Sequence, residues 1–131
     1  MFRNRPFLEW LRNTKKHELE ISIIAYVETL FWYKTLGLGK DDFDEELENL
    51  ALSVVGFSRN LADSITANAM KHRRTFSFKH HARDYMIGTS ALESNATLIT
   101  YNLDDFNWMK EEGGTVHTPE SFIATESAKT R

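Results

Sequence analysis

The 131-residue chain contains no cysteine and only two prolines and six glycines. Without cysteine there is no disulfide, no thiolate metal ligand and no cysteine nucleophile, which fits a reducing compartment such as the cytoplasm. No apolar run approaches the roughly 18 residues that a membrane span needs, and the first residues lack the apolar stretch of a secretory signal. We therefore expect a cytoplasmic protein without membrane contact.

Neither sign of charge is in large excess, because the chain has 16 basic and 19 acidic residues. The whole chain is no polycation, so contact with nucleic acid would need a local basic patch. The apolar fraction of 41% and the aromatic fraction of 12% suffice for a core and argue against a disordered chain. The length predicts a single domain over residues 1–123, followed by a small, polar and flexible tail over 124–131.

Helical and extended patterns alternate along the chain, which predicts an α/β fold. Extended segments are expected at 19–24, 52–57, 96–101 and 115–117. Helices are expected from Pro6 and over 26–36, 41–51, 58–69 and 80–94. Strands separated by helices imply a mostly parallel sheet with helices on both faces.

Acidic and amide side chains lie near the ends of these strands. Glu28 follows the first strand, and Asn102 and Asp105 follow the strand at 96–101. Asp84 lies in the first turns of the helix before that strand. Ligands of open α/β sheets bind beyond the carboxyl ends of strands, and carboxylates gathered there repel one another unless a cation lies between them. Carboxylate oxygens are the ligands of hard cations such as Mg²⁺ or Mn²⁺.

Each acid also has an ordinary structural interpretation. Glu28 could complement the dipole of its helix, and Asp84 could form a surface ion pair with the adjacent Arg83. Asp104 and Asp105 could cap a turn. The shared position at one rim favours the metal site over these alternatives.

Two longer segments resemble a known family. Residues 82–93, followed by 96–106, resemble the C-terminal signature of PIN-domain ribonucleases, above all the VapC-type toxins of prokaryotic toxin–antitoxin pairs. Residues 21–28 resemble the second acidic block of that family, and residues 118–122 its closing Thr-Pro-Glu-x-Phe. The resemblance covers roughly residues 6–123 and implies a PIN-like α/β fold.

The resemblance implies roles for individual residues. Glu28 and Asp84 match the second and third acidic positions, Asn102 matches the fourth, and Asp105 follows three residues later. These four residues would hold Mg²⁺ or Mn²⁺, with Glu28, Asp84 and Asp105 catalytic, and the hydroxyl of Thr100 would support them. The implied activity is metal-dependent hydrolysis of RNA phosphodiesters. The implied partners are an RNA substrate, a cognate antitoxin and a second copy of the chain.

The N-terminus departs from the family. PIN domains open with a central strand that ends in Asp-Thr or Asp-Ser and supplies the first metal ligand, but no aspartate precedes Asp41 here. We therefore expect a sheet that lacks its N-terminal central strand in this numbering. Either the polypeptide starts upstream of Met1, or the chain is a shortened relative. The alternative function is accordingly a catalytically inactive PIN-like module that binds protein or RNA.

Two runs of charge and one aromatic run complete the pattern. Residues 40–49 hold one lysine against six acids, interpreted as a solvated helix face rather than a partner site. Residues 71–83 hold five basic residues, three histidines and no acid, so they form either an RNA-phosphate contact or an ordinary basic loop. The proposed RNA contacts are Arg73, Arg74, Lys79 and Arg83. The apolar run 30–33 either contributes to an interface or belongs to a fully buried helix.

A zinc site formed by the three histidines of the basic run is not expected. His72, His80 and His81 lack cysteine partners and the spacing of a helical i, i+4 pair.

Overall fold

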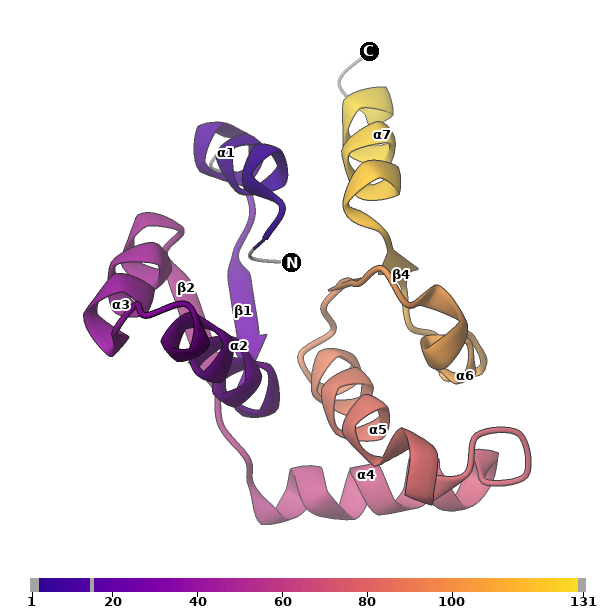
Figure 1. Ribbon diagram of the computed structural model, residues 1–131. Helices are drawn as coiled ribbons and strands as arrows, with labels where there is room; N and C mark the ends of the chain where they lie inside the picture. Colours follow the sequence, from indigo (N-terminus) through magenta and orange to yellow (C-terminus); the bar gives the residue numbers. More distant parts are fainter. Residues whose placement is uncertain (1–2, 15, 130–131) are drawn as a thin grey trace. The chain divides into compact units, whose positions relative to one another are not determined.

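A computed structural model of the chain describes residues 3–14 and 16–129 (Figure 1). Helices alternate with short parallel strands, so the mixed α/β class predicted from the sequence is confirmed. The chain divides into two compact units, Phe2–Gly56 and Phe57–Arg131. The prediction of one domain over residues 1–123 stays a prediction.

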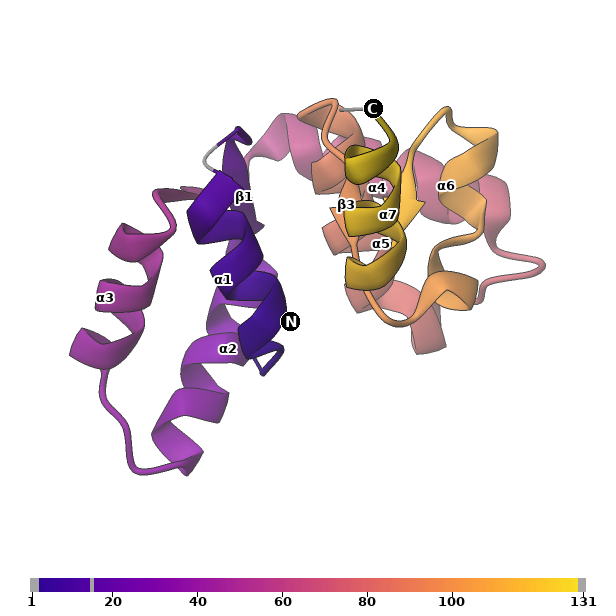
Figure 2. The ribbon, with the colours of Figure 1, turned by 90° about the horizontal axis from the view of Figure 1, so that it is seen from above.

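The first unit contains three helices around one pair of strands. In chain order these are α1 (Arg5–Thr14), β1 (Leu19–Ser22), α2 (Ile23–Thr35), α3 (Lys40–Asn49) and β2 (Leu52–Val55). Strands β1 and β2 pair in parallel, with Leu19 opposite Leu52 and Ser22 opposite Val55. Helices α2 and α3 pack against each other, as both ribbon views show (Figures 1 and 2).

Helix α2 begins earlier than the sequence predicts. The hydroxyl of Ser22 accepts a hydrogen bond of 3.1 Å from the backbone N–H of Ala25, which caps a helix that starts at Ile23. The extended segment predicted at 19–24 therefore ends at Ser22, because this cap satisfies one of the N–H groups that the first turn of a helix leaves without a backbone partner. Glu28 consequently lies in the second turn of α2 and is exposed.

The core of the first unit is aromatic. Phe43 of α3 is fully buried, and its ring centroid lies 5.1 Å from those of Tyr26 and Tyr33 of α2. Burial raises the pKa of Tyr33 above 10.0. Phe31 points outward and is 70% exposed, so the interpretation of run 30–33 as a fully buried helix is wrong. Its alternative role in an interface stays a prediction.

The acidic run of α3 is not uniformly solvated. Glu46 is buried, and its carboxylate oxygens lie 3.3 Å from Nη1 of Arg5 and 3.1 Å from Nη2 of Arg12. The interpretation as a solvated face therefore fails at this one position, because two arginines on α1 compensate the buried charge.

The second unit is mostly helical. Its elements are α4 (Arg59–His72), α5 (Phe78–Glu93), β3 (Leu98–Ile99), the 3₁₀ helix η1 (Leu103–Phe106), α6 (Trp108–Glu111), β4 (Val116–His117) and α7 (Pro119–Lys129). Strands β3 and β4 pair in parallel. Helix α5 packs against α4, η1 and α6 (Figure 1).

Local signals set several boundaries in this unit. Ser58 caps α4 with a hydrogen bond of 3.0 Å from the N–H of Leu61, and Asn95, which follows α5, has a left-handed φ of 52°. By contrast, the strand expected at 96–101 covers only Leu98–Ile99. The tail predicted from residue 124 is helical as far as Lys129.

The core of the second unit forms where α5 meets α6. Tyr85 and Trp108 are buried with ring centroids 5.0 Å apart. Gly88 faces the same indole, and a Cβ atom there would lie 2.6 Å from Cζ2 of Trp108. The absence of a side chain at Gly88 thus allows the two elements to pack closely.

Among the described residues the strands form two separate pairs, β1–β2 and β3–β4. A single parallel sheet with helices on both faces, and the PIN-like arrangement lacking its central strand, therefore stay predictions. Within residues 3–14 and 16–129, none of the helices combines the length and apolar character that a membrane span requires.

Candidate metal centre

Asp84 lies on α5, directly after an irregularity in that helix. The backbone of His81 leaves the helical region, with φ −127° and ψ 15°, so Asp84 occupies the first turn of the segment that follows. The neighbouring Tyr85 is buried in the core and donates a hydrogen bond of 2.6 Å to the carbonyl of Phe76. Burial also raises the pKa of Tyr85, which keeps its hydroxyl protonated as that donor.

The two oxygens of Asp84 have different partners. Oδ1 lies 3.2 Å from Nη1 of Arg83, and Oδ2 lies 3.3 Å from Nδ1 of His81. The side chain of Asp84 is only 11% exposed, whereas that of Arg83 is 51% exposed. The ion pair with Arg83 that the sequence offered as an alternative is therefore present, but it occupies one oxygen only.

Asp105 reaches the same place from η1. Its N–H donates a hydrogen bond of 3.2 Å to the carbonyl of Asn102, whose own N–H donates to Oγ1 of Thr100 at 3.1 Å. Thr100 thus supports the turn that carries Asp105, and its role behind metal ligands stays a prediction. Thr100 supports the turn through the backbone of Asn102.

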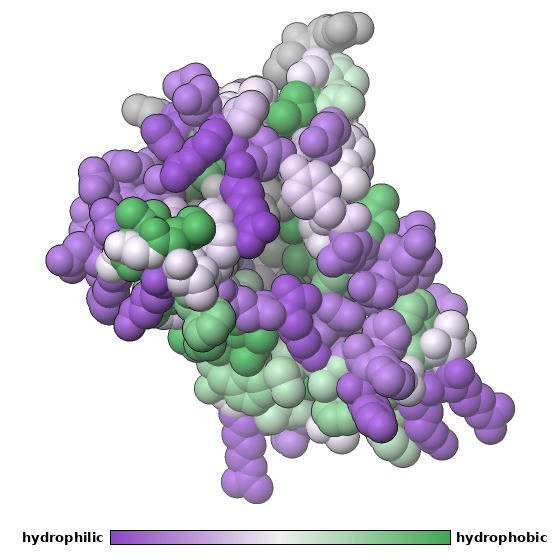
Figure 3. Space-filling view, viewed as in Figure 1, coloured by the Kyte–Doolittle hydropathy of each residue, from purple (hydrophilic) through white to green (hydrophobic). Residues whose placement is uncertain are grey.

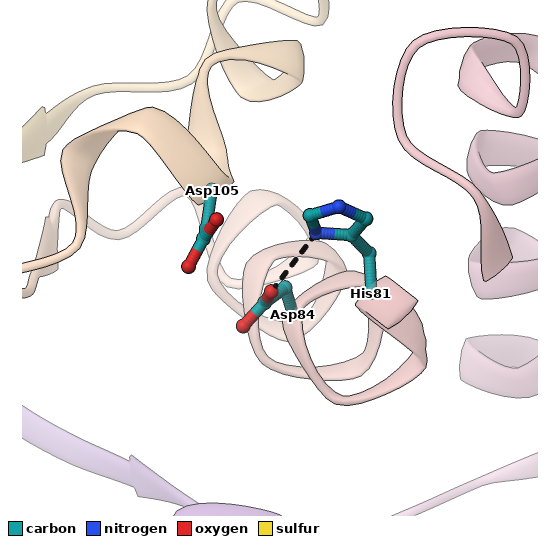
Figure 4. Close-up of side chains that lie close together, drawn as sticks. All are labelled: His81, Asp84 and Asp105. Atoms are coloured by element: carbon teal, nitrogen blue, oxygen red, sulfur yellow. Dashed lines mark hydrogen bonds and ion pairs between the residues drawn. The ribbon is translucent and has the colours of Figure 1, made fainter. Parts of the chain in front are cut away.

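His81, Asp84 and Asp105 form one cluster. Their potential ligand atoms, one from each residue, lie within 4.8 Å of one another. Figure 4 shows His81 and Asp84 rising from the same helix, with the carboxylate of Asp105 approaching from a separate element. One imidazole and two carboxylates are a donor set that fits a divalent metal ion. Asp84 and Asp105 are therefore brought together as the sequence predicts.

The other predicted ligands are Asn102, of the second unit, and Glu28, of the first unit. Asn102 is exposed at the start of η1, and Asp104 beside it is also exposed and outside the cluster. Glu28 belongs to the first unit, so its convergence with Asp84 and Asp105 stays a prediction. The sequence interpretation missed His81, although its i, i+3 spacing from Asp84 was a usable signal.

The basic run 71–83 is divided between two roles. Arg73, Arg74, Lys79 and Arg83 are exposed, and the space-filling view shows hydrophilic side chains projecting where α4 leads into α5 (Figure 3). Arg73 donates to the carbonyl of Met70 at 2.8 Å. Arg74 and Lys79 form no ion pair with the described residues, so they are available to an anionic ligand.

The first two residues of the run, Lys71 and His72, instead link α4 to the end of α6 through their side chains. Nζ of Lys71 lies 2.8 Å from Glu112, and the buried ring of His72 lies between Glu111 and Glu112 at 3.4 and 3.3 Å. The hydrogen bond from Lys71, aided by His72, lowers the pKa of Glu112, and the same bond raises the pKa of Lys71. Lys71 and His72 therefore link these two helices, and His72 lies outside the group of His81, Asp84 and Asp105.

Comparison with known proteins gives no family for this chain. No protein-family model matches it, and no curated protein does.

Proposed function

We propose that the protein is a metal-dependent ribonuclease that hydrolyses RNA phosphodiesters and resembles the toxin half of a toxin–antitoxin pair. The observation that carries the proposal is the approach of Asp84 and Asp105 from two separate elements, with one oxygen of Asp84 directed toward the cluster. Carboxylates of different elements repel when brought together, which is tolerated where a cation is bound between them.

The proposed roles follow from these positions. Asp84 and Asp105 would hold Mg²⁺ or Mn²⁺ with Asn102 as a further ligand of the same unit, and the resemblance adds Glu28 to this set. A metal ion held by these residues would supply charge stabilisation at the scissile phosphate and would activate a water molecule for in-line attack. Arg73, Arg74, Lys79 and Arg83 project from the same stretch of chain as Asp84 and bind RNA phosphates.

The resemblance to VapC-type toxins extends the proposal. It implies a PIN-like sheet with helices on both faces and a cytoplasmic location. It also implies that the protein binds a cognate antitoxin and pairs with a second copy of itself. The exposed Phe31 on α2 supports a protein interface, since large apolar side chains are enriched where proteins associate.

The proposal is tested by RNA cleavage with Mg²⁺, with Mn²⁺ and with a chelator. Asp105→Asn should reduce cleavage at least ~100-fold, because it removes a charge from the metal site. Asp104→Asn is the matched control: the neighbouring acid is exposed and outside the cluster, so cleavage should be unchanged. Equal cleavage by both variants, or cleavage that survives chelation, would refute the metal-dependent mechanism.

A second candidate is a catalytically inactive PIN-like module that binds RNA or protein. It is favoured by the partners of Asp84, because Arg83 and His81 can balance this carboxylate without a metal. This candidate predicts RNA binding that is weakened by removing Arg74 and Lys79, with no cleavage under any metal condition.

A further inference from the structure

We infer that His81 is a protein ligand of the metal, and that the site selects a divalent ion that accepts a nitrogen ligand, such as Zn²⁺ or Mn²⁺, over Mg²⁺. The inference deepens the proposed function, since it concerns the same metal centre. It adds a nitrogen donor to a set that the sequence described as oxygen alone.

The imidazole is held in place for this role. Its Nδ1 faces Oδ2 of Asp84 at 3.3 Å, on the side where Asp105 approaches (Figure 4). The His81 ring also meets Phe76 edge-to-face, with centroids 5.3 Å apart. Phe76 is in turn fixed through its carbonyl by the hydroxyl of the buried Tyr85. Ligand orientation by such supporting contacts is usual in protein metal sites.

The spacing of the donor atoms suits one ion. Metal–ligand bonds of about 2.1 Å place two ligands of the same ion at most about 4.2 Å apart. The three potential ligand atoms lie within 4.8 Å of one another, so small side-chain rotations bring them to a common metal. His81 and Asp84 share one helix and Asp105 comes from η1, so the three donors belong to two separate elements.

The types of ligand atom distinguish between metals, whereas the local charge favours any divalent ion. Arg83 compensates Asp84 through Oδ1, which leaves the two carboxylates and this guanidinium with a net charge near −1. Mg²⁺ prefers oxygen ligands throughout, commonly carboxylates and water. Imidazole is a good ligand for Zn²⁺ and other transition metals, whose affinities exceed that of Mg²⁺ at mixed nitrogen and oxygen sites.

The experiment measures binding of the metals themselves to the whole chain, without RNA. Isothermal titration calorimetry with Mn²⁺, Zn²⁺ and Mg²⁺ compares the parent with His81→Ala and His81→Gln. We expect Mn²⁺ to bind the parent at least ~10-fold more tightly than Mg²⁺, and each variant to lose ~10-fold or more of the Mn²⁺ affinity but little of the Mg²⁺ affinity. The matched control is His80→Ala, because His80 is exposed and outside the cluster.

A spectroscopic signature separates ligation from mere folding effects. In electron spin-echo spectra of bound Mn²⁺, modulation by a coordinated ¹⁴N nucleus should appear in the parent and in His80→Ala and vanish in His81→Gln. Circular dichroism verifies that each variant is folded. Absence of the ¹⁴N signal from the parent would overturn the inference, as would unchanged Mn²⁺ affinity in both His81 variants.

These outcomes are distinguishable from failure of the ribonuclease proposal. RNA cleavage that is supported equally by Mg²⁺ and Mn²⁺ and survives His81→Gln would overturn the inference and leave the proposed function standing. A parent that binds none of the three metals would overturn both.

Discussion

Arg83 and Asp84 are neighbours in sequence and partners in space, with Nη1 of the arginine 3.2 Å from Oδ1 of the aspartate. His81 faces the other oxygen of the same carboxylate. Asp105, by contrast, has no ion pair among the described residues. The two acids of the cluster are therefore electrostatically unequal, and their neutralisation should have opposite effects on stability.

In the presence of a chelator, Asp84→Asn should lower the free energy of unfolding by about 1 kcal/mol, because a largely buried side chain loses its ion pair with Arg83 and weakens its contact with His81. Asp105→Asn should leave it unchanged or raise it by about 0.5 kcal/mol, since it relieves repulsion from Asp84. Urea unfolding of both variants and the parent measures the difference. Changes of the same sign in both would contradict this account of the cluster.

Mn²⁺ should raise the melting temperature of the parent. A ligand that binds only the native state stabilises it by mass action, about 2.7 kcal/mol at a concentration 100 times Kd. The gain should disappear in Asp84→Asn and in Asp105→Asn but persist in Asp104→Asn, whose acid is outside the cluster. Thermal melts with and without metal test this, and an equal gain in all four proteins would show binding elsewhere.

Gly88→Ala should destabilise the second unit by about 2 kcal/mol, the cost of overpacking a close contact. Its Cβ would lie 2.6 Å from the indole of Trp108, which is itself buried and has little room to move. Gly56→Ala is the control, because no atom lies within 4 Å of its Cβ position. Urea unfolding followed by tryptophan fluorescence should show a loss for Gly88→Ala alone.

Glu46→Gln should destabilise the first unit by about 1–2 kcal/mol, since the buried carboxylate accepts charge-assisted hydrogen bonds from Arg5 and Arg12. Glu45 is its exposed neighbour on α3, so Glu45→Gln should change stability by less than about 0.5 kcal/mol. Chemical denaturation compares the pair. If the two substitutions cost the same, the arginines do not hold α1 to α3.

Glu112 should give stability a dependence on acid pH. Lys71, and then His72, lower the pKa of this carboxyl below its usual 4.5, so its contribution is fully present above that value and is lost as pH falls through the folded-state pKa. Glu112→Gln should therefore lower the melting temperature by about 3 °C at pH 7, an amount typical of a modest ion pair.

The same difference should shrink below about pH 4.5 and vanish once Glu112 is protonated in the folded parent as well. Glu111→Gln is the comparison, because that carboxylate also faces His72 but is 72% exposed. A pH series of thermal melts distinguishes them. A difference between parent and Glu112→Gln that persists at low pH would assign the effect to packing instead of charge.

Local signals in the sequence predicted part of this structure. Ser58 before α4 and Asn95 after α5 were recognisable because a helix cap depends on the residue itself and on its immediate neighbours. The same logic could have placed the start of α2 at Ser22, but the apolar residues after it also suit a buried strand. Periodicity alone does not separate these two states over so short a run.

The sequence by itself determined the alternation of helices and strands, some helix ends, such as the start of α4 and the end of α5, and the presence of acidic residues near the ends of strands. Only the tertiary structure decided that Asp84 and Asp105 meet, that His81 joins them, and that Glu46 is buried between arginines. The physical reason is the range of the interactions. Caps and propensities act within a turn or two, whereas these side chains are brought together by the packing of α5 with η1 and of α1 with α3, which depends on many distant contacts at once.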